Sequence, residues 1–182
     1  MDPVNDERTT YIMARADIEN AALGTAPSHE IDFNFPLWSE ILTDLWLGGT
    51  DDFDTIGFSK RSEQIKKADF DTVVTLYAWA HPVDWFVQEL RYGFYDDTSN
   101  SFSEKELMHA ARFAHDSWKS GKRVLVRCQA GINRSSLVMG IVLMLEGYTA
   151  DQAISMMRRK RSMAVLMNKS FENYLRELNL DE

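Results

Sequence analysis

The sequence predicts one α/β domain with a central mixed, mostly parallel sheet, flanking helices and a helix-rich C-terminal half. Short runs rich in β-branched and apolar residues occur at 45–47, 72–76 and 124–126, which is typical of buried strands. Stretches with helical spacing and recognisable caps lie between and after them. At 182 residues, with 45% hydrophobic and 26% charged residues, the chain is long enough for one well-buried core.

The N-terminal residues are expected to lie apart from this domain. Residues 1–30 contain a helical stretch at 9–23, closed by Gly24, and are predicted to form an arm. The domain is predicted to span residues 31–182. The other elements expected in its first half are a helix at 62–68 and a shorter strand at 91–95.

The C-terminal half carries clearer helix signals. Ser103 and Glu106 form a capping box, and apolar residues follow at helical spacing until Gly121 closes the helix. The stretch at 134–146 is apolar nearly all round, so its helix is expected to be central and buried. Two more helices are expected, one opened by a capping box at Thr149 and Gln152 and running to about residue 161, the other at 169–178.

The loop after the strand at 124–126 carries the chemistry. Cys128 follows that strand directly, and the loop consists of Gln129, Ala130, Gly131, Ile132 and Asn133. Because a helix follows at once, the backbone N–H groups of residues 129–134 are expected to point at one place and to form a nest for an oxyanion. These amides and the positive end of the helix favour the ionised form of the Cys128 thiol, which is the nucleophilic form.

Three neighbouring residues suit the same chemistry. Arg134, on the first turn of the helix, has a planar fork that can bind two phosphate oxygens, which lysine could not do with the same geometry. Gly131 suits a loop that reverses with a positive φ. The Ser135 hydroxyl can hydrogen-bond the sulfur and make it a better leaving group. A buried cysteine is more often a small hydrophobe, but packing alone does not explain these three residues at their spacings.

A cysteine, five residues, an arginine and a serine between an apolar strand and a helix resemble the signature of the cysteine-dependent protein phosphatases. Ala130-Gly131-Ile132 with Arg134-Ser135 is most similar to their dual-specificity branch, in its atypical, bacterial and phage-like form. The segment at 40–48 resembles the opening strand of that branch, and the likeness covers roughly residues 35–180. It implies the fold of a dual-specificity phosphatase.

The chain departs from the family's pattern at two positions. Arg127 stands directly before the cysteine, where histidine is usual, and Asn133 stands before the arginine, where serine is frequent. We hypothesise that Arg127 supports the loop or the thiolate in place of histidine, because a positive charge favours ionised sulfur.

The resemblance implies a two-step hydrolysis without metal or other cofactor. Cys128 attacks phosphorus while Arg134 and the loop amides hold the equatorial oxygens. A protonated aspartate then gives its proton to the leaving oxygen and later accepts one from the water that cleaves the phosphocysteine. Asp96 and Asp97 stand where the family carries this acid; we prefer Asp96, and Asp97 stays open.

Ligands of such sheets bind beyond the carboxyl ends of the strands. We therefore expect the Cys128 loop, the segment after residue 76 and the loop holding Asp96 and Asp97 to meet on one rim. The implied substrate is a phosphoprotein, with phosphotyrosine hydrolysed and phosphoserine and phosphothreonine as further substrates.

Composition narrows the other expectations. The net charge of −8 argues against nucleic acid as the partner, because duplex binding depends on basic residues. The single cysteine excludes an internal disulfide and a multi-cysteine metal site. No apolar stretch is long enough to cross a membrane, and the acidic, polar N-terminus is unlike a secretory signal. We predict a cytoplasmic monomer that binds no membrane.

Two other functions stay open. The segment at 52–55 is similar to the D-x-D-x-T pattern of magnesium-dependent phosphatases with an aspartate nucleophile, although Thr55 stands one position early and Asp52 does not follow an apolar strand directly. A catalytically silent module that binds phosphorylated partners is the other alternative. Inactive relatives typically lack the cysteine or the arginine, and both are present here.

Several conspicuous residues are expected to be structural. Packing is favoured over substrate contact for Tyr77, Trp79 and His81. The basic run at 158–161 is expected to be the solvated end of a helix, where positive charge suits the dipole. Methionines are expected to fill gaps in the core, among them Met156, Met157, Met163 and Met167.

Overall fold

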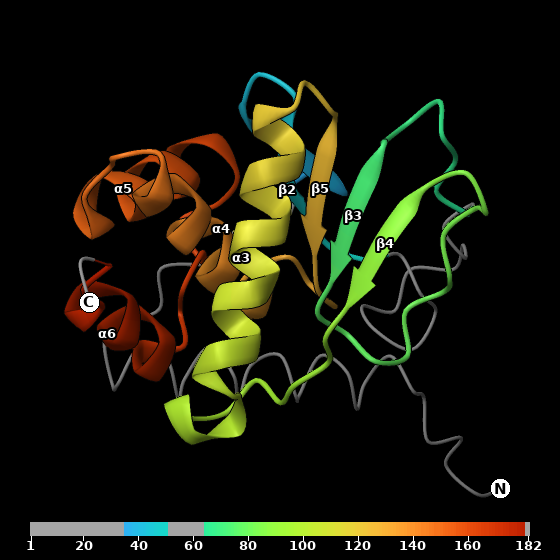
Figure 1. Cartoon of the computed structure of the whole chain (residues 1–182). Coiled ribbons are helices and arrows are strands. Elements are labelled where there is room, and N and C mark those ends of the chain that lie inside the picture. The colour runs from blue at the N-terminus through green and yellow to red at the C-terminus, as the bar shows by residue number, and fades with distance from the viewer. Residues whose placement is uncertain (1–34, 51–63, 181–182) are drawn as a thin grey trace, which may run out of the picture.

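A mixed five-stranded sheet forms the centre of the computed structural model, which describes residues 35–50 and 64–180. Its order is β1-β2-β5-β3-β4, with β1 antiparallel to β2 and every other neighbouring pair parallel. The predicted mixed, mostly parallel sheet is therefore confirmed (Figure 1). The strands are β1 (Trp38–Leu42), β2 (Leu45–Gly48), β3 (Thr72–Thr75), β4 (Gln88–Arg91) and β5 (Val124–Arg127).

The helices lie mainly on one face of this sheet (Figure 1). Helix α4 contacts α3, α5, α6 and strand β5, and its residues from Arg134 to Leu143 are all buried, which confirms the predicted central helix. No helix within the described ranges is long and apolar enough to cross a membrane. The helices are α3 (Glu104–Lys119), α4 (Arg134–Leu145), α5 (Ala150–Lys160) and α6 (Lys169–Glu177), with a short 3₁₀ turn, η1, at Ser99–Ser101.

The two faces of β5 are packed differently. Side chains alternate between faces along a strand. Val124 and Val126 belong to the core beneath the helices, whereas Leu125 packs with Val73 and Phe70 on the other face. Cys128 belongs to the helix side. The alternation therefore sends the side chains of Cys128 and the preceding residue toward opposite faces.

The predicted caps are present, one of them only in part. At α5, the Thr149 hydroxyl accepts from the Gln152 amide and the Gln152 side chain accepts from the Thr149 amide, so this capping box is complete. At α3, the Ser103 hydroxyl accepts from the Glu106 amide. The Ser103 amide, however, donates to the Tyr92 hydroxyl at 2.7 Å, which replaces the second half of the predicted box.

Two predicted elements differ from the structure. The strand expected at 91–95 is β4, three residues earlier, and it ends at Arg91. Its polar residues and its position at the sheet edge hide the usual alternation. The helix expected at 62–68 is absent over residues 64–68, and positions 62 and 63 lie outside the described ranges. There the Asp69 carboxylate accepts from the Lys66 amide and forms a local turn that competes with a helix.

Other predictions concern residues that the structure does not describe. These are the helical stretch at 9–23 and the aspartate motif at 52–55. The division into an arm at 1–30 and a domain at 31–182 stays a prediction.

Glu172 joins the last two helices. Its buried carboxylate accepts from Arg158 of α5 at 3.0 Å, from Lys169 at 2.7 Å and from Arg176 at 2.9 Å. Burial raises the pKa of this carboxyl, but the bonds from Lys169 and Arg158 outweigh that effect and hold the pKa below the ordinary value of 4.5.

We expect Glu172→Gln to lower the free energy of unfolding by about 2 kcal/mol at pH 7, the usual size for hydrogen bonds to a charged group. A carboxyl whose pKa is depressed in the folded protein contributes stability above its unfolded pKa and loses it as the pH falls through the folded value. In denaturant melts, the difference in unfolding free energy between the native protein and Glu172→Gln should therefore be smaller at pH 3.5 than at pH 7. Glu177→Gln, on the exposed side of the same helix, is the matched control. An equal difference in unfolding free energy at both pH values would contradict the prediction.

Candidate active site

Cys128 lies at the point where β5 ends, and only 1% of its surface is exposed. Its backbone amide donates to the Gly48 carbonyl at 3.2 Å, which continues the parallel pairing with β2 by one residue. The sulfur accepts from the Gly131 amide at 3.3 Å and lies 3.2 Å from the Ser135 hydroxyl. The loop thus turns back over its own cysteine before α4 begins.

Arg134 is the first residue of α4, and its side chain reaches back along the loop. Nη1 donates to the Phe94 carbonyl and Nη2 to the Gln129 side chain, each at 3.2 Å. The guanidinium lies 5.4 Å from the centre of the Tyr77 ring. Its Nε is buried and has no hydrogen-bond partner within the described ranges. Unpaired buried donors are costly, and this Nε is therefore able to take a further acceptor, such as an oxyanion.

Gly131 occupies the tightest position of the loop. Its φ is +70°, in the left-handed region that favours glycine. A Cβ at this position would lie 2.4 Å from the carbonyl carbon of Gly48 on β2. The loop is therefore pressed against the sheet at a place where only glycine fits, as its sequence position predicted.

We expect Gly131→Ala to reduce the affinity for vanadate, an oxyanion that mimics phosphate, by about tenfold. The added methyl group must displace the backbone of β2. In addition, an alanine in the left-handed conformation costs on the order of 1–2 kcal/mol. Gly121 also has a positive φ, but nothing lies within 4 Å of its hypothetical Cβ. Gly121→Ala should therefore cost stability without weakening vanadate binding. Equal vanadate affinity in both variants would contradict this reading of the loop.

Asp96 is held against the loop by two amide side chains. One carboxylate oxygen accepts from Asn133 at 3.0 Å, and the other accepts from Asn168 at 2.9 Å. Asn168 also caps α6, and its own backbone amide donates to the Asn133 side chain. The loop before α3, the Cys128 loop and the start of α6 are thereby joined.

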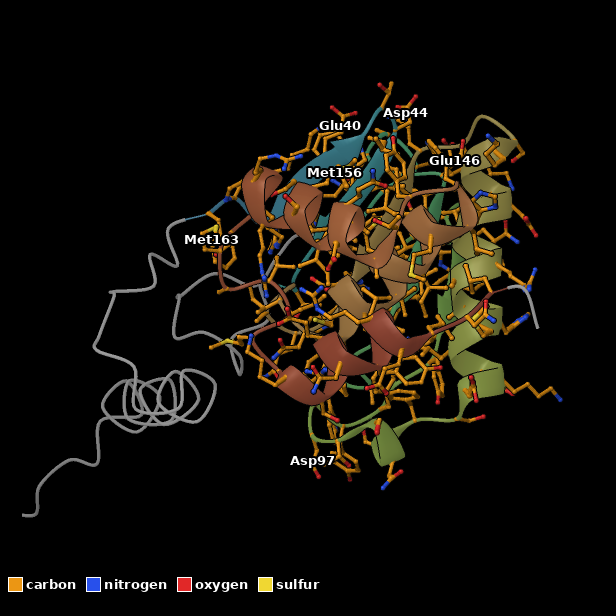
Figure 2. All side chains as sticks on the ribbon, turned by 90° about the vertical axis from the view of Figure 1, so that its left-hand side faces the viewer. Glu40, Asp44, Asp97, Glu146, Met156 and Met163 are labelled. Atoms are coloured by element: carbon orange, nitrogen blue, oxygen red, sulfur yellow. The ribbon has the colours of Figure 1, made fainter. Side chains whose placement is uncertain are left out.

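Asp97 is placed differently. Its carbonyl accepts from Asn168 at 2.8 Å, but its exposed carboxylate has no hydrogen bond within residues 35–50 and 64–180. Figure 2 shows Asp97 at the edge of the molecule. Of the two predicted acid candidates, the structure therefore brings only the Asp96 carboxylate into contact with the loop.

The segment after β3 forms a further wall. Tyr77 is buried beside Arg134, so packing holds for this residue. Trp79 contacts the Tyr77 ring but is 70% exposed, and His81 is also exposed, so neither side chain belongs to the buried core, and the choice between packing and substrate contact stays a prediction for both. With Tyr77 beside Arg134 and Asp96 bonded to Asn133, the three segments meet at one rim, as expected.

Arg127 is buried, but on the side of the sheet away from Cys128. Its Nε donates to the Thr75 hydroxyl at 2.9 Å, and Nη2 donates to the His81 carbonyl at 2.7 Å and lies 3.4 Å from Glu89. These bonds tie the segment after β3 to β5 and β4. The residue that replaces the usual histidine thus supports a wall of the rim.

Arg161 is the main residue that the sequence did not reveal. The basic run at 158–161 is not a solvated helix end throughout, because Arg161 is 7% exposed and lies behind the loop. Its Nε donates to the Gly131 carbonyl at 2.6 Å and Nη2 to the Ala130 carbonyl at 3.1 Å. Two arginines of the same run point elsewhere or to solvent, so residue type alone could not single out Arg161. Met163, two residues on, is 75% exposed rather than core (Figure 2).

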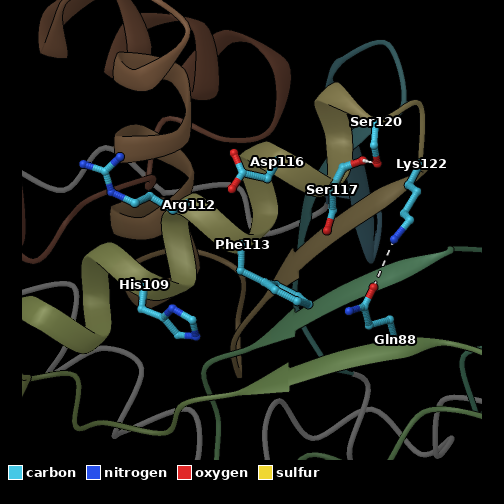
Figure 3. A pocket seen from close by; sticks show the side chains of 8 residues that line it. All are labelled: Gln88, His109, Arg112, Phe113, Asp116, Ser117, Ser120 and Lys122. Carbon is cyan, nitrogen blue, oxygen red and sulfur yellow. Dashed lines mark hydrogen bonds between the residues drawn. The ribbon is translucent and has the colours of Figure 1, made fainter.

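A separate shallow groove of about 480 Å³ lies between α3 and the edge strand β4 (Figure 3). Lys122 donates to Gln88 across one end of it. The remaining lining side chains come from α3 and the turn after it, and none of them is a predicted site residue: His109, Arg112, Phe113, Asp116, Ser117 and Ser120. The groove therefore does not compete with the Cys128 loop as the candidate active site.

The family of this chain follows from its match to a known family model. A family model described as the catalytic domain of dual specificity phosphatases matches residues 58–180. The chain belongs to the dual specificity phosphatase family. This confirms the resemblance inferred from the Cys128 loop.

Relatives extend the comparison. An Invertebrate iridescent virus 6 protein named "Putative tyrosine phosphatase 123R" is 35% identical over 68 residues, which cover 37% of this chain and 48% of that protein. The chain thus spans about half the length of the curated relative that it matches.

Solved structures show the same fold. Human DUSP28 matches with a TM-score of 0.61 and 20% identity, covering 78% of this chain and 92% of that one. Tk-PTP in its active form matches with a TM-score of 0.59 and 23% identity, covering 79% and 99%. The human tyrosine phosphatase-like serine/threonine/tyrosine-interacting protein matches with a TM-score of 0.60 and 19% identity, covering 77% and 93%.

Proposed function

We propose that this dual specificity phosphatase family member hydrolyses phosphotyrosine in proteins, with phosphoserine and phosphothreonine as further substrates. The observation that carries the proposal is the cup around Cys128. A buried sulfur, an amide directed at it and a guanidinium with an unpaired Nε lie together at the carboxyl end of β5. A phosphoryl group needs this combination of a nucleophile and fixed donors for its oxygens.

In the first step, the Cys128 thiolate attacks phosphorus in line with the leaving oxygen. The S–P bond forms as the P–O ester bond breaks, while Arg134 and the loop amides hold the equatorial oxygens. Asp96 gives its proton to the departing oxygen. Its bonds to Asn133 and Asn168 support this role, because they place the carboxyl beside the loop.

In the second step, water attacks the phosphocysteine. Asp96 accepts a proton from this water, the S–P bond breaks and inorganic phosphate leaves. Ser135 supports this step because its hydroxyl, 3.2 Å from the sulfur, can stabilise the departing thiolate. No step in this scheme uses a metal ion.

The test is hydrolysis of phosphotyrosine, phosphoserine and phosphothreonine peptides in two separate assays, one with and without EDTA and the other, free of chelator, with and without vanadate. We expect turnover that EDTA leaves unchanged and vanadate blocks, fastest on phosphotyrosine. Binding of the phosphopeptides without any turnover would instead identify a phospho-binding module of the same fold. Turnover that requires added magnesium would overturn the cysteine mechanism.

A further inference from the structure

The phosphate-binding loop presents its amides inward because its carbonyls are held outward. All peptide bonds of the described residues are trans, so the C=O of one residue and the N–H of the next point in opposite directions. The Ala130 carbonyl accepts from Arg161, and in the same peptide unit the Gly131 amide donates to the Cys128 sulfur. A donor behind the loop thereby fixes an amide in front of it.

Neighbouring peptide units repeat this arrangement. The Gly131 carbonyl also accepts from Arg161, so the Ile132 amide is turned to the opposite side. The outer units are held by backbone amides, since Gln129 O accepts from Thr50 N at 2.9 Å and Ile132 O accepts from Leu166 N at 3.0 Å. Arg161 is therefore the one side chain in the described ranges that fixes two consecutive units at the centre of the loop.

The rest of the guanidinium is anchored to the start of the sheet. Nη1 donates to the Ser39 hydroxyl and the Leu47 carbonyl, each at 3.2 Å, and also to the carbonyls of Pro36 and Leu37. The Phe35 ring lies 4.7 Å from the guanidinium carbon. The guanidinium has five N–H groups on three nitrogens, so its six acceptors share hydrogens at Nη1; a lysine ammonium, with three N–H groups on one nitrogen, cannot reach them with the same geometry.

The charge of Arg161 also matters, because no carboxylate of the described residues pairs with it. Its bonds go to carbonyls and a hydroxyl. Burial lowers the pKa of this guanidinium to about 10, while the charge of Cys128 acts in the opposite direction. At neutral pH, Arg161 is therefore a buried cation behind the loop that carries Cys128.

We propose that Arg161 is a positioning residue for the phosphate-binding loop: from behind, it orients the central amides toward the oxyanion, and its charge favours the ionised form of Cys128. The proposal deepens the proposed function, on which its consequences for turnover depend. It also reassigns to Arg161 the support of the thiolate that the sequence suggested for Arg127.

The experiment compares Arg161→Met, which removes charge and fork, with Arg161→Lys, which keeps the charge alone. Cys128 is the only cysteine, so its alkylation by iodoacetate can be followed by mass without ambiguity. The pH midpoint of alkylation reports thiol ionisation. The dissociation constant of vanadate, measured by calorimetry, reports binding of an oxyanion to the loop. Neither quantity depends on turnover by the variant. Arg158→Met, on the same helix but bonded to Val165 and Glu172, is the matched control.

We expect Arg161→Met to raise the alkylation midpoint by about one pH unit, the lower end of what a nearby opposite charge contributes. Vanadate affinity should fall about tenfold. Arg161→Lys should keep the native midpoint but still lose vanadate affinity, because it lacks the fork. Arg158→Met should change neither quantity, and thermal melts will identify variants that do not fold.

Native vanadate affinity in folded Arg161→Lys would overturn the proposal, and so would a native midpoint in folded Arg161→Met. If Arg161→Met does not fold, the lysine variant alone decides. Failure of the proposed function looks different: the native protein would not hydrolyse phosphopeptides, while the shifts in alkylation and vanadate binding would still separate the Arg161 variants from Arg158→Met.

Discussion

Cys128→Ser is expected to abolish hydrolysis of an aryl phosphate, with kcat reduced about 10⁴-fold or more, as happens when an enzyme loses its nucleophile. A serine hydroxyl is not ionised near neutral pH, so the cup would hold a phosphoryl group without attacking it. The Gly131 amide and the Ser135 hydroxyl keep their positions around the shorter side chain. Affinity for a phosphotyrosine peptide should therefore change by less than about fivefold.

The measurement pairs steady-state kinetics with peptide binding by calorimetry. Ser136→Ala is the control, because the Ser136 hydroxyl is buried in the same helix start and has no hydrogen-bond partner in the described part of the chain. It should retain native turnover. Full activity in Cys128→Ser would end the cysteine mechanism, and a magnesium requirement in that variant would direct attention to the aspartate motif at 52–55.

The sequence predicts what depends on neighbouring residues. The strand at 124–126, the cysteine loop and the helix after it follow one another directly, so their spacing alone places Cys128, Gly131 and Arg134 around one point. The complete capping box at Thr149 is also a local signal, since both of its bonds join residues three apart.

Contacts between segments that are distant in the sequence cannot be predicted from local spacing. Arg161 reaches Gly131 and Leu47 across the fold, and nothing in a basic run says which of its members turns inward. The sequence also does not predict the β1–β2 hairpin. Its turn holds Asp44 at φ +62°, a conformation that non-glycine residues adopt only occasionally. The edge strand β4 carries little apolar pattern. Such features require the tertiary pairing itself.

Asp96 is the proposed general acid. Asp96→Asn is expected to lower kcat on phenyl phosphate about 10²–10³-fold, within the usual range for removal of a general acid. Asp97→Asn should stay within about threefold of the native protein, because the Asp97 carboxylate makes no bond to the loop within the described ranges. The two variants differ only in which of two adjacent carboxyls becomes an amide, so each is the control for the other.

The leaving group provides the decisive comparison. Phenolate needs a proton as the P–O bond breaks, whereas p-nitrophenolate leaves readily without one. Loss of the proton donor should therefore lower kcat on phenyl phosphate far more than kcat on p-nitrophenyl phosphate. In Asp96→Asn, kcat should therefore depend steeply on the pKa of the leaving group. In the native protein and in Asp97→Asn, this dependence should be shallow. If Asp97→Asn steepens it instead, the loop before α3 must shift on substrate binding, exchanging the Asn133 and Asn168 bonds of Asp96 for a position that brings Asp97 to the phosphorus. An equal loss on both substrates in Asp96→Asn would instead mean that this carboxyl only holds the loop in place.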